Sequence, residues 1–217
     1  MGIQTMGEIA NADEDMLYRS FGIDAKLLID HAWGREPTTI ADIKAYKPKA
    51  SSLSHGQVLA RDYSFEECML VVKEMTDALC LDMAGQGLVT QSLTLTLGYS
   101  NTLTVKLANG TTTMTVCTNS YRIIIPYVVE LYERIADKNK SIRRLNLSCN
   151  RVMDETYEQY DLFTDYKKLE RDKKLQKAAL KIKGKYGKNA LVRGMDLLEA
   201  GIAMSRNCQI GGHKSGE

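Results

Sequence analysis

Neighbouring carboxylates are the first side chains to test for chemistry, because paired acids hold divalent metals or move protons. Three such groups occur, Asp13-Glu14-Asp15, Glu66-Glu67 and Asp154-Glu155. None falls in a predicted strand beside a second carboxylate. Solvation, or a position at a helix start where negative charge is favourable, explains each group. The acids therefore predict no catalytic metal site, and we expect this chain to hold no cofactor.

The histidines and cysteines indicate no nucleophile with its base. His31 lies in a predicted helix, His55 in the first predicted strand of the second domain, and His213 in a glycine-rich tail. The five cysteines have no close pairing, and four of them fall inside apolar patterns, so we expect reduced core residues and no metal site. They are Cys68, Cys80, Cys117, Cys149 and Cys208.

The peptide Gln159-Tyr160-Asp161-Leu162-Phe163 is the strongest candidate for recognition chemistry. It lies between an acidic segment and a lysine-rich helix, so we expect its apolar pair in a flexible connector. In a short linear motif of this kind, Leu162 and Phe163 fill a pocket on a partner while Gln159 fixes the register. The alternative is that Phe163 packs on its own domain.

The net charge of +2 hides two opposite ends. Residues 1–42 contain eight acids and three bases, whereas residues 165–193 contain eleven bases and three acids. The basic end indicates a polyanion partner, and a solvated helix face is the equal alternative. No apolar run approaches the roughly 18 residues that a membrane span needs, and the start has no signal pattern. We therefore expect a cytoplasmic protein without a membrane partner.

The elements that must position these groups fall into two regions. Residues 1–36 show short helices joined by tight turns, and in the third helix Ile23, Leu27, Leu28 and Ala32 mark the apolar face. Residues 37–50 contain two of the three prolines and no helix or strand periodicity, which predicts an interdomain linker.

Residues 51–152 alternate between strand and helix patterns. Strand patterns lie around 53–59, 93–97, 113–116 and 142–149, and helix patterns over 65–83 and 124–135. We expect Asn109-Gly110 to close a hairpin and Pro126 to lie in the first turn of the second helix. The order predicts an α+β sandwich, a four-stranded, mainly antiparallel sheet with two helices on one face.

The other face of that sheet is expected to be bare and polar. Burial of Leu145 and Leu147 turns Arg144, Asn146 and Ser148 outward. The threonines expected to point the same way are Thr94, Thr96, Thr113 and Thr115. Hydroxyls, amides and arginines suit phosphate oxygens, and the lack of an aromatic ladder argues against base stacking. An ordinary solvated sheet face is the alternative.

Three motifs together make the pattern specific, Gly2-Ile3-x-Thr5-x-Gly7-Glu8-Ile9-Ala10, Ser54-His55-Gly56-Gln57-x-Leu59-x-Arg61-Asp62-Tyr63 and Ile142-Arg143-Arg144-Leu145. Over nearly its whole length the chain resembles the C-terminal part of a Y-family translesion DNA polymerase, of the bacterial DNA polymerase V and mutagenesis-protein type. The resemblance divides it into the helical end of the thumb (1–36), a linker (37–50), the little finger (51–152), a connector (153–165) and a basic helical tail (166–217).

In that family the little finger holds template and primer phosphates through its sheet, which implies DNA-binding roles for the matching positions. The expected DNA-binding residues are Ser52, Ser54, His55, Arg61, Thr111, Thr113, Arg143, Arg144 and Asn146. The peptide at 159–163 resembles the sequence that binds the bacterial sliding clamp. The implied partners are damaged or primer-template DNA and that clamp, and the implied role is DNA damage tolerance by an error-prone polymerase.

The resemblance also bears on catalysis. In the family, the Mg²⁺ ions and the groups that bind the triphosphate belong to the palm and fingers, which precede the thumb. We therefore expect no polymerase activity from this chain alone. A non-catalytic protein-interaction module that uses the open sheet face is the alternative function.

Overall fold

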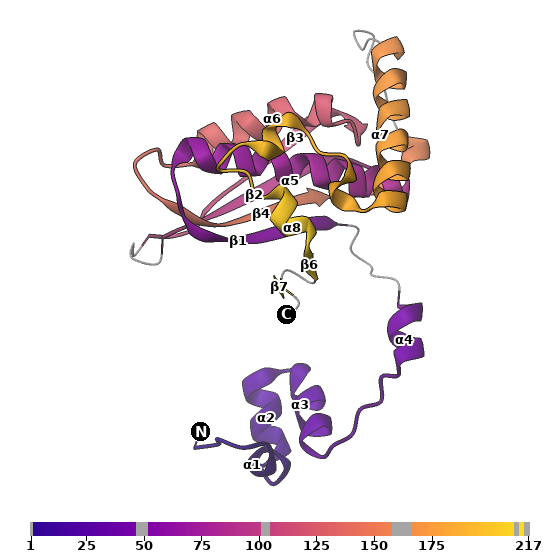
Figure 1. The fold of residues 1–217 in the computed structure, drawn as a ribbon. Helices are drawn as coiled ribbons and strands as arrows, with labels where there is room; N and C mark the ends of the chain where they lie inside the picture. Colours follow the sequence, from indigo (N-terminus) through magenta and orange to yellow (C-terminus); the bar gives the residue numbers. More distant parts are fainter. Residues whose placement is uncertain (1, 47–51, 101–104, 158–165, 211–212, 215–217) are drawn as a thin grey trace. The chain divides into compact units, whose positions relative to one another are not determined.

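The computed structural model describes residues 2–46, 52–100, 105–157, 166–210 and 213–214 (Figure 1). The chain forms two compact units, Met1–Lys49 and Ala50–Glu217.

The N-terminal unit is helical, as its short periodic segments predict. Helices α1 (Met6–Ala10), α2 (Glu14–Phe21) and α3 (Asp24–Ala32) pack around a small core. Side-chain caps begin the first two helices, because Thr5 and Asp13 each accept a hydrogen bond from a backbone N–H of the first turn. The buried residues of this core are Leu17, Ala25 and Ile29.

The apolar face of α3 differs from the expected one. Ala25 and Ile29 are buried, whereas Ile23 is 88% exposed and Leu27 is 56% exposed. Helix α3 therefore has apolar residues on two faces, and only one of them packs within the unit.

Helix α4 (Ile40–Ala45) lies in the segment predicted to be a linker without helix. Its start is a capping box, in which Thr39 Oγ1 accepts from the N–H of Asp42 and the Asp42 carboxylate accepts from the N–H of Thr39. Local capping stabilises this short helix, which buries none of its residues.

The C-terminal unit contains the predicted antiparallel sheet. Its strands are β1 (Leu53–Tyr63), β2 (Leu88–Tyr99), β3 (Ala108–Thr118) and β4 (Ile142–Asn150), in the order β1-β4-β2-β3. A fifth short strand, β5 (Met153–Asp154), pairs with the start of β2. The strand segments of the sequence are confirmed, and the mixed α+β fold class with them.

Helices α5 (Phe65–Gln86) and α6 (Tyr121–Ile135) cover one face of this sheet (Figure 1). Helix α5 begins with a capping box between Ser64 and Glu67 and ends at Gly87, whose φ of 66° is the left-handed conformation that glycine adopts readily. The side chains buried between the layers include Met75, Leu79, Met83, Leu93, Leu95, Val128, Leu131, Leu145 and Leu147. Alternation along the strands therefore sends the leucines inward and leaves the other face for polar residues.

Asn109-Gly110 was expected to close the hairpin between β2 and β3, and this prediction was wrong. Both residues lie inside β3, opposite Thr96 and Leu95 of β2. A Cβ at position 110 would lie 2.7 Å from Ile135 Cγ2, on α6, so any larger residue there would displace this side chain. The Asn-Gly pair thus marks a close approach of helix to sheet.

The prediction that Pro126 lies in the first turn of α6 was wrong. The helix begins at Tyr121, so Pro126 lies inside it, beyond the first turn. Proline has no N–H to donate and crowds the preceding turn. Burial of Ile124, Val128, Leu131 and Tyr132 along one face of the helix offsets this loss.

The tail folds onto the helical side of the sandwich. After the short 3₁₀ segment Glu155–Tyr157 comes the long helix α7 (Tyr166–Tyr186). The remaining elements are the 3₁₀ segments Lys188–Ala190 and Gly194–Leu197, helix α8 (Ala203–Asn207) and the short strands β6 (Gln209–Ile210) and β7 (His213–Lys214).

Two carboxylates of α5 hold this tail. Arg193 Nη2 lies 2.6 Å from Asp77 Oδ1, and Glu74 Oε2 accepts a hydrogen bond of 2.9 Å from the N–H of Ile202. Glu74 is buried, and desolvation raises its pKa. No helix in the described ranges is long and apolar enough to cross a membrane.

Candidate nucleic-acid interface

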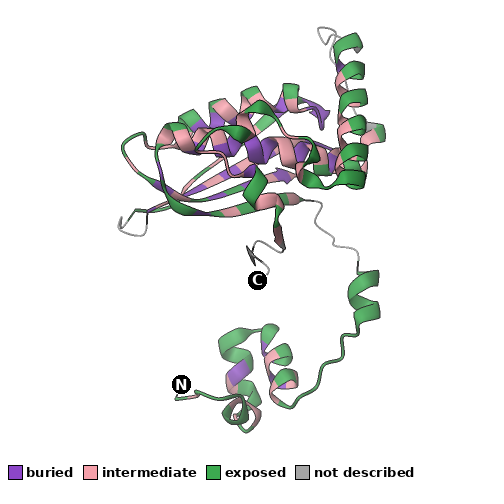
Figure 2. Ribbon diagram, in the orientation of Figure 1, coloured by how far each residue is buried: buried purple, intermediate pink, exposed green. Residues whose placement is uncertain are grey.

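The strand register brings polar side chains into rows across the face of the sheet that α5 and α6 leave uncovered. One row across the four strands consists of Ser54, Ser148, Thr94 and Thr111. The next row consists of Gly56, Asn146, Thr96 and Asn109. We call these positions, together with Ser92, Thr113, Arg144 and Asn150, the open face. Figure 2 shows exposed and half-buried residues along the strands that form it.

Hydrogen bonds within the open face orient its side chains. The hydroxyls of Thr94 and Thr111 lie 2.8 Å apart, Asn150 Nδ2 donates to Thr94 Oγ1 at 2.8 Å, and Ser148 Oγ donates to Asn146 Oδ1 at 2.9 Å. A hydroxyl has one donor and two acceptor lone pairs, and an amide has two donors. These contacts therefore leave donors available to an anionic ligand.

An irregularity in β4 places two arginines side by side. Ile142 and Leu145 are both buried, and two residues, Arg143 and Arg144, lie between them. Strict alternation of a strand would place only one outward-facing residue between two buried ones. The register of β4 with both neighbouring strands shifts at this point, as in a β-bulge. The shift keeps the leucines of β4 in the core while two cations remain outside it.

The surroundings of the two arginines differ. Arg143 Nη1 lies 3.5 Å from Asp62 Oδ1, and the Arg143 side chain is 31% exposed. Arg144 is exposed and forms no ion pair with an acid among the described residues. Its neighbour across β2 is Gly98, where a Cβ would lie 3.0 Å from Arg144 Cβ. Leu107 Cδ2 would lie 3.3 Å from the same Cβ, so the side chains of Arg144 and Leu107 occupy the space above Gly98.

A shallow cavity of about 580 Å³ lies at one end of the open face. All of its lining residues except Met153 have polar side chains, and four of them were not predicted from the sequence, namely Gln91, Ser92, Asn150 and Arg151. Arg151 follows β4 directly and has a positive φ of 49°. Extending the alternation of β2 and β4 by one step at each end would have identified Ser92 and Asn150.

His55 does not lie with the open-face residues. It pairs with Leu147 across β4, and both side chains face α5. Its Nε2 lies 2.7 Å from Asp82 Oδ2 of that helix. His55 was expected to face the DNA backbone, on the open face. It faces α5 instead, because alternation that starts from the inward-facing Leu53 places every second residue of β1 on the helix side.

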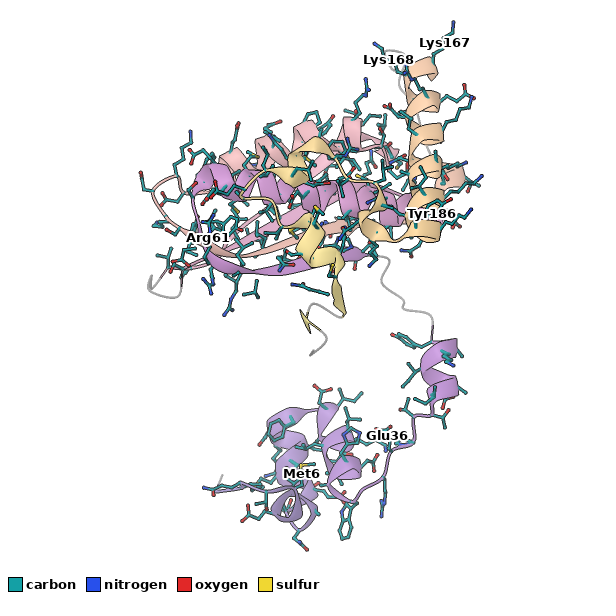
Figure 3. All side chains as sticks on the ribbon, viewed as in Figure 1. Met6, Glu36, Arg61, Lys167, Lys168 and Tyr186 are labelled. Atoms are coloured by element: carbon teal, nitrogen blue, oxygen red, sulfur yellow. The ribbon has the colours of Figure 1, made fainter. Side chains whose placement is uncertain are left out.

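Arg61 is also held within its own domain. Its two terminal nitrogens donate to the Glu67 carboxylate at 2.6 and 3.0 Å, and its guanidinium lies 4.3 Å from the ring centroid of Tyr63. The paired guanidinium, with the N–H of Ser64, lowers the pKa of Glu67 to about 2. Figure 3 shows Arg61 at one end of the sandwich. Because Glu67 compensates its charge, Arg61 is less available to an anionic ligand than Arg144.

The structure brings the other predicted DNA-binding residues to one surface. Ser54, Asn146, Thr111 and Thr113 lie on the open face, and Ser52 is exposed just before β1. The predicted clamp-binding residues, Gln159, Tyr160, Asp161, Leu162 and Phe163, lie outside the described residues.

Within the ranges that the structure describes, no group of three metal-ligating side chains is placed to hold an ion. Cys68, Cys80, Cys117 and Cys149 are buried, and Cys208 is exposed. Burial raises the pKa of the Cys68 and Cys149 thiols to about 12.

Comparison with known proteins identifies the family of the domain that contains this surface. Residues 50–162 match the model of the impB/mucB/samB family C-terminal domain. The chain is 28% identical over 224 residues to "DNA polymerase IV 2" of Bacillus subtilis (strain 168), a match that covers 98% of this chain and 51% of that protein. It is also 28% identical over 220 residues to the "Putative UV-damage repair protein UvrX" of the same strain, with 99% and 51% covered.

The chain thus spans about half the length of these curated relatives. A solved structure, "Y-family DNA polymerase chimera Dbh-Dpo4(243-245)-Dbh", matches with a TM-score of 0.43 and 14% identity over 70% of this chain and 42% of that chain. The family model covers more than half of the 217 residues and coincides with the sheet and its two helices. The chain therefore belongs to the impB/mucB/samB family and contains the C-terminal domain of that family.

Proposed function

We propose that this chain is the DNA-binding C-terminal region of an error-prone translesion polymerase, and that its open face holds the backbone of primer-template duplex. The observation that supports this most directly is the uncovered polar sheet face, on which the exposed Arg144 lies among hydroxyl and amide side chains. Family membership and the names of the relatives, a DNA polymerase and a UV-damage repair protein, agree with it.

The chemistry of the open face suits phosphates better than bases. Serine and threonine hydroxyls and asparagine amides donate to phosphate oxygens, and Arg144 adds a charge-assisted contact. The open face contains no aromatic side chain on which a base can stack. The surface is therefore suited to hold a duplex in place without reading its sequence.

Binding of a sliding clamp through residues 159–163 is a second part of the proposal. Its support is the sequence of the peptide and its position at the end of the matched domain, which extends to residue 162. Two apolar side chains give a weak contact alone, at about 1.5 to 3 kcal/mol each. Such a contact is useful as a tether, because it raises the local concentration of an enzyme already on DNA.

Nucleotidyl transfer itself is proposed to depend on residues outside this chain. The reaction requires divalent metals, here Mg²⁺, between carboxylates, together with cationic groups on the triphosphate. The DNA polymerase V type suggested by the sequence stays a prediction, because the relatives named above are a DNA polymerase IV 2 and UvrX.

A salt titration of duplex binding tests the proposal against a protein-interaction module. If the open face contacts several phosphates, log K should fall linearly with log salt, with a slope of about −0.9 for each phosphate. The affinity should be the same for unrelated sequences of equal length. Absent binding, or binding that salt does not change, would favour the protein-interaction module.

A further inference from the structure

Helix α7 contains a second basic surface, on the side opposite to its packing face. The side chains at one-turn spacing along its exposed side are Lys167, Arg171, Lys174, Lys177, Lys181 and Lys185. Steps of three and four residues place them on one face of the helix. We call this set the α7 stripe. At 1.5 Å per residue it is about 27 Å long.

The opposite side of α7 fixes the helix to the domain. Leu169 is buried, Gln176 Nε2 donates to the Asn119 carbonyl at 3.0 Å, and Leu180 packs against Gly85 of α5. Arg122 Nε of α6 lies 2.9 Å from Asp172 Oδ2. These contacts hold the stripe on the outer side, and Figure 3 shows Lys167 and Lys168 projecting from the start of the helix.

The charges of the stripe are poorly compensated within the chain. Lys174 pairs with Glu170 at 3.2 Å, with both side chains largely exposed. Lys167, Arg171, Lys177 and Lys181 form no ion pair with any described acid. Lys177 and Lys181, like Lys181 and Lys185, are like charges at a spacing of four residues, which destabilises a helix. An anionic ligand that lies along the helix removes this repulsion.

We propose that the α7 stripe is a second DNA-binding surface, which contacts the phosphates of duplex DNA. Duplex DNA has one charge per about 1.7 Å of axis, so a straight row of cations about 27 Å long meets enough phosphates for every member. Lysine, a point charge on a flexible stem, suits phosphates and reads no base.

Duplex DNA fits the stripe better than a single strand. Single-strand sites combine positive charge with aromatic side chains on which bases stack. No member of the stripe is aromatic, and the exposed neighbour Tyr186 has Lys185 Nζ 5.1 Å from its ring centroid. The inference goes beyond the proposed function, because the stripe does not belong to the open face.

The test compares two double variants that remove equal charge. Lys177→Gln with Lys181→Gln neutralises the stripe and preserves helix propensity, and Lys73→Gln with Lys138→Gln neutralises two cations elsewhere. The stripe variant should bind duplex DNA about tenfold more weakly, and its salt slope should be smaller in magnitude by about 1.8, because two phosphate contacts are lost. The control should match the wild type, and circular dichroism should show equal helix content in both.

Equal duplex affinity of the two double variants would overturn the proposal and point to an acidic protein surface as the ligand of the stripe. A loss seen only with a single strand of equal length would overturn the duplex assignment. The variant Arg143→Ala with Arg144→Ala, measured beside them, separates the two proposals. If it binds as the wild type does while the stripe variant weakens, the open-face function fails and the stripe stands.

Discussion

At the scale of single residues, the two arginines of β4 are expected to contribute unequally to DNA binding. Arg144 is exposed and has no acidic partner among the described residues, whereas Arg143 lies 3.5 Å from an Asp62 oxygen. Replacing Arg144 with alanine should therefore weaken duplex binding more than the same change at Arg143. A charge-assisted hydrogen bond is worth about 1.5 to 3 kcal/mol, so we expect a loss of about tenfold or more.

Fluorescence anisotropy with two duplexes of unrelated sequence measures this difference. Both duplexes should lose the same factor, because a phosphate contact reads no base. Lys73→Ala, on the helical side, serves as a control of equal charge. Unchanged affinity of the Arg144→Ala protein would remove Arg144 from the interface.

The Arg61–Glu67 pair makes stability depend on pH in the acid range. The pKa of Glu67 is lowered from 4.5 to about 2, so its folded form binds fewer protons than its unfolded form between these values. The stability from this pair is complete above pH 4.5 and is lost as the pH falls towards 2. Denaturant unfolding between pH 2 and 6 should show a smaller acid-induced loss for Glu67→Gln than for the wild type. Parallel curves for the two proteins would contradict this role.

Single residues also show what the sequence could and could not reveal. Alternation assigned Arg144, Asn146 and Ser148 correctly to the polar face, because one buried face fixes the register of a whole strand. The same rule, applied from Leu53, turns His55 inward, so that signal was present in the sequence. The Arg61–Glu67 pair was not predictable, because it joins a strand end to a helix start.

At the scale of elements, the approach of α6 to β3 depends on Gly110. A Cβ at this position would lie 2.7 Å from Ile135 Cγ2 and 2.8 Å from Leu131 Cδ1, both in the core layer. Gly110→Ala should therefore destabilise the domain by about 1–3 kcal/mol, the usual range for an overpacked core. Urea denaturation measures the change, and Asn109→Ala at the exposed neighbouring position is the control. Equal stability of the two variants would show that α6 and the sheet can move apart at this point without loss of stability.

The elements divide into those with a strong local signal and those without one. Helix α5 was predicted because its apolar period, its capping box at Ser64 and its terminal Gly87 agree. Helix α4 was missed because its segment has prolines on both sides and no apolar period, and only its Thr39 cap marks it. The position of Pro126 inside α6 was missed because packing against the sheet outweighed the local preference.

At the scale of the whole molecule, DNA binding and clamp binding are expected to depend on different residues. Leu162 and Phe163 are expected to bind the clamp, and the open face is expected to bind DNA. Replacing both with alanine should abolish binding to a purified bacterial sliding clamp in surface plasmon resonance, because the two anchors of the peptide are lost. Duplex affinity should stay at the wild-type value. Loss of both activities together would show that the pair belongs to the fold of the domain.

The layout of the C-terminal unit followed from its sequence, because strand and helix periods alternate there in an order that permits few arrangements. The tail was only partly predictable. The basic composition of α7 was evident, but the docking of the segment after α7 depends on contacts distant in sequence, such as Arg193 with Asp77 and the N–H of Ile202 with Glu74. No local pattern marks such pairs.

The central claim is that duplex DNA lies on the open face of the sheet. Cysteine footprinting tests it directly, because Cys208 is exposed and the other four cysteines are buried. Two variants are made in a Cys208→Ser background, one with cysteine in place of Asn146, on the open face, and one with cysteine in place of Lys73, on α5. The rate of alkylation of the introduced thiol is then measured with and without saturating duplex DNA. DNA should slow the reaction at position 146 and leave the rate at position 73 unchanged. Equal rates at position 146 with and without DNA would contradict the account.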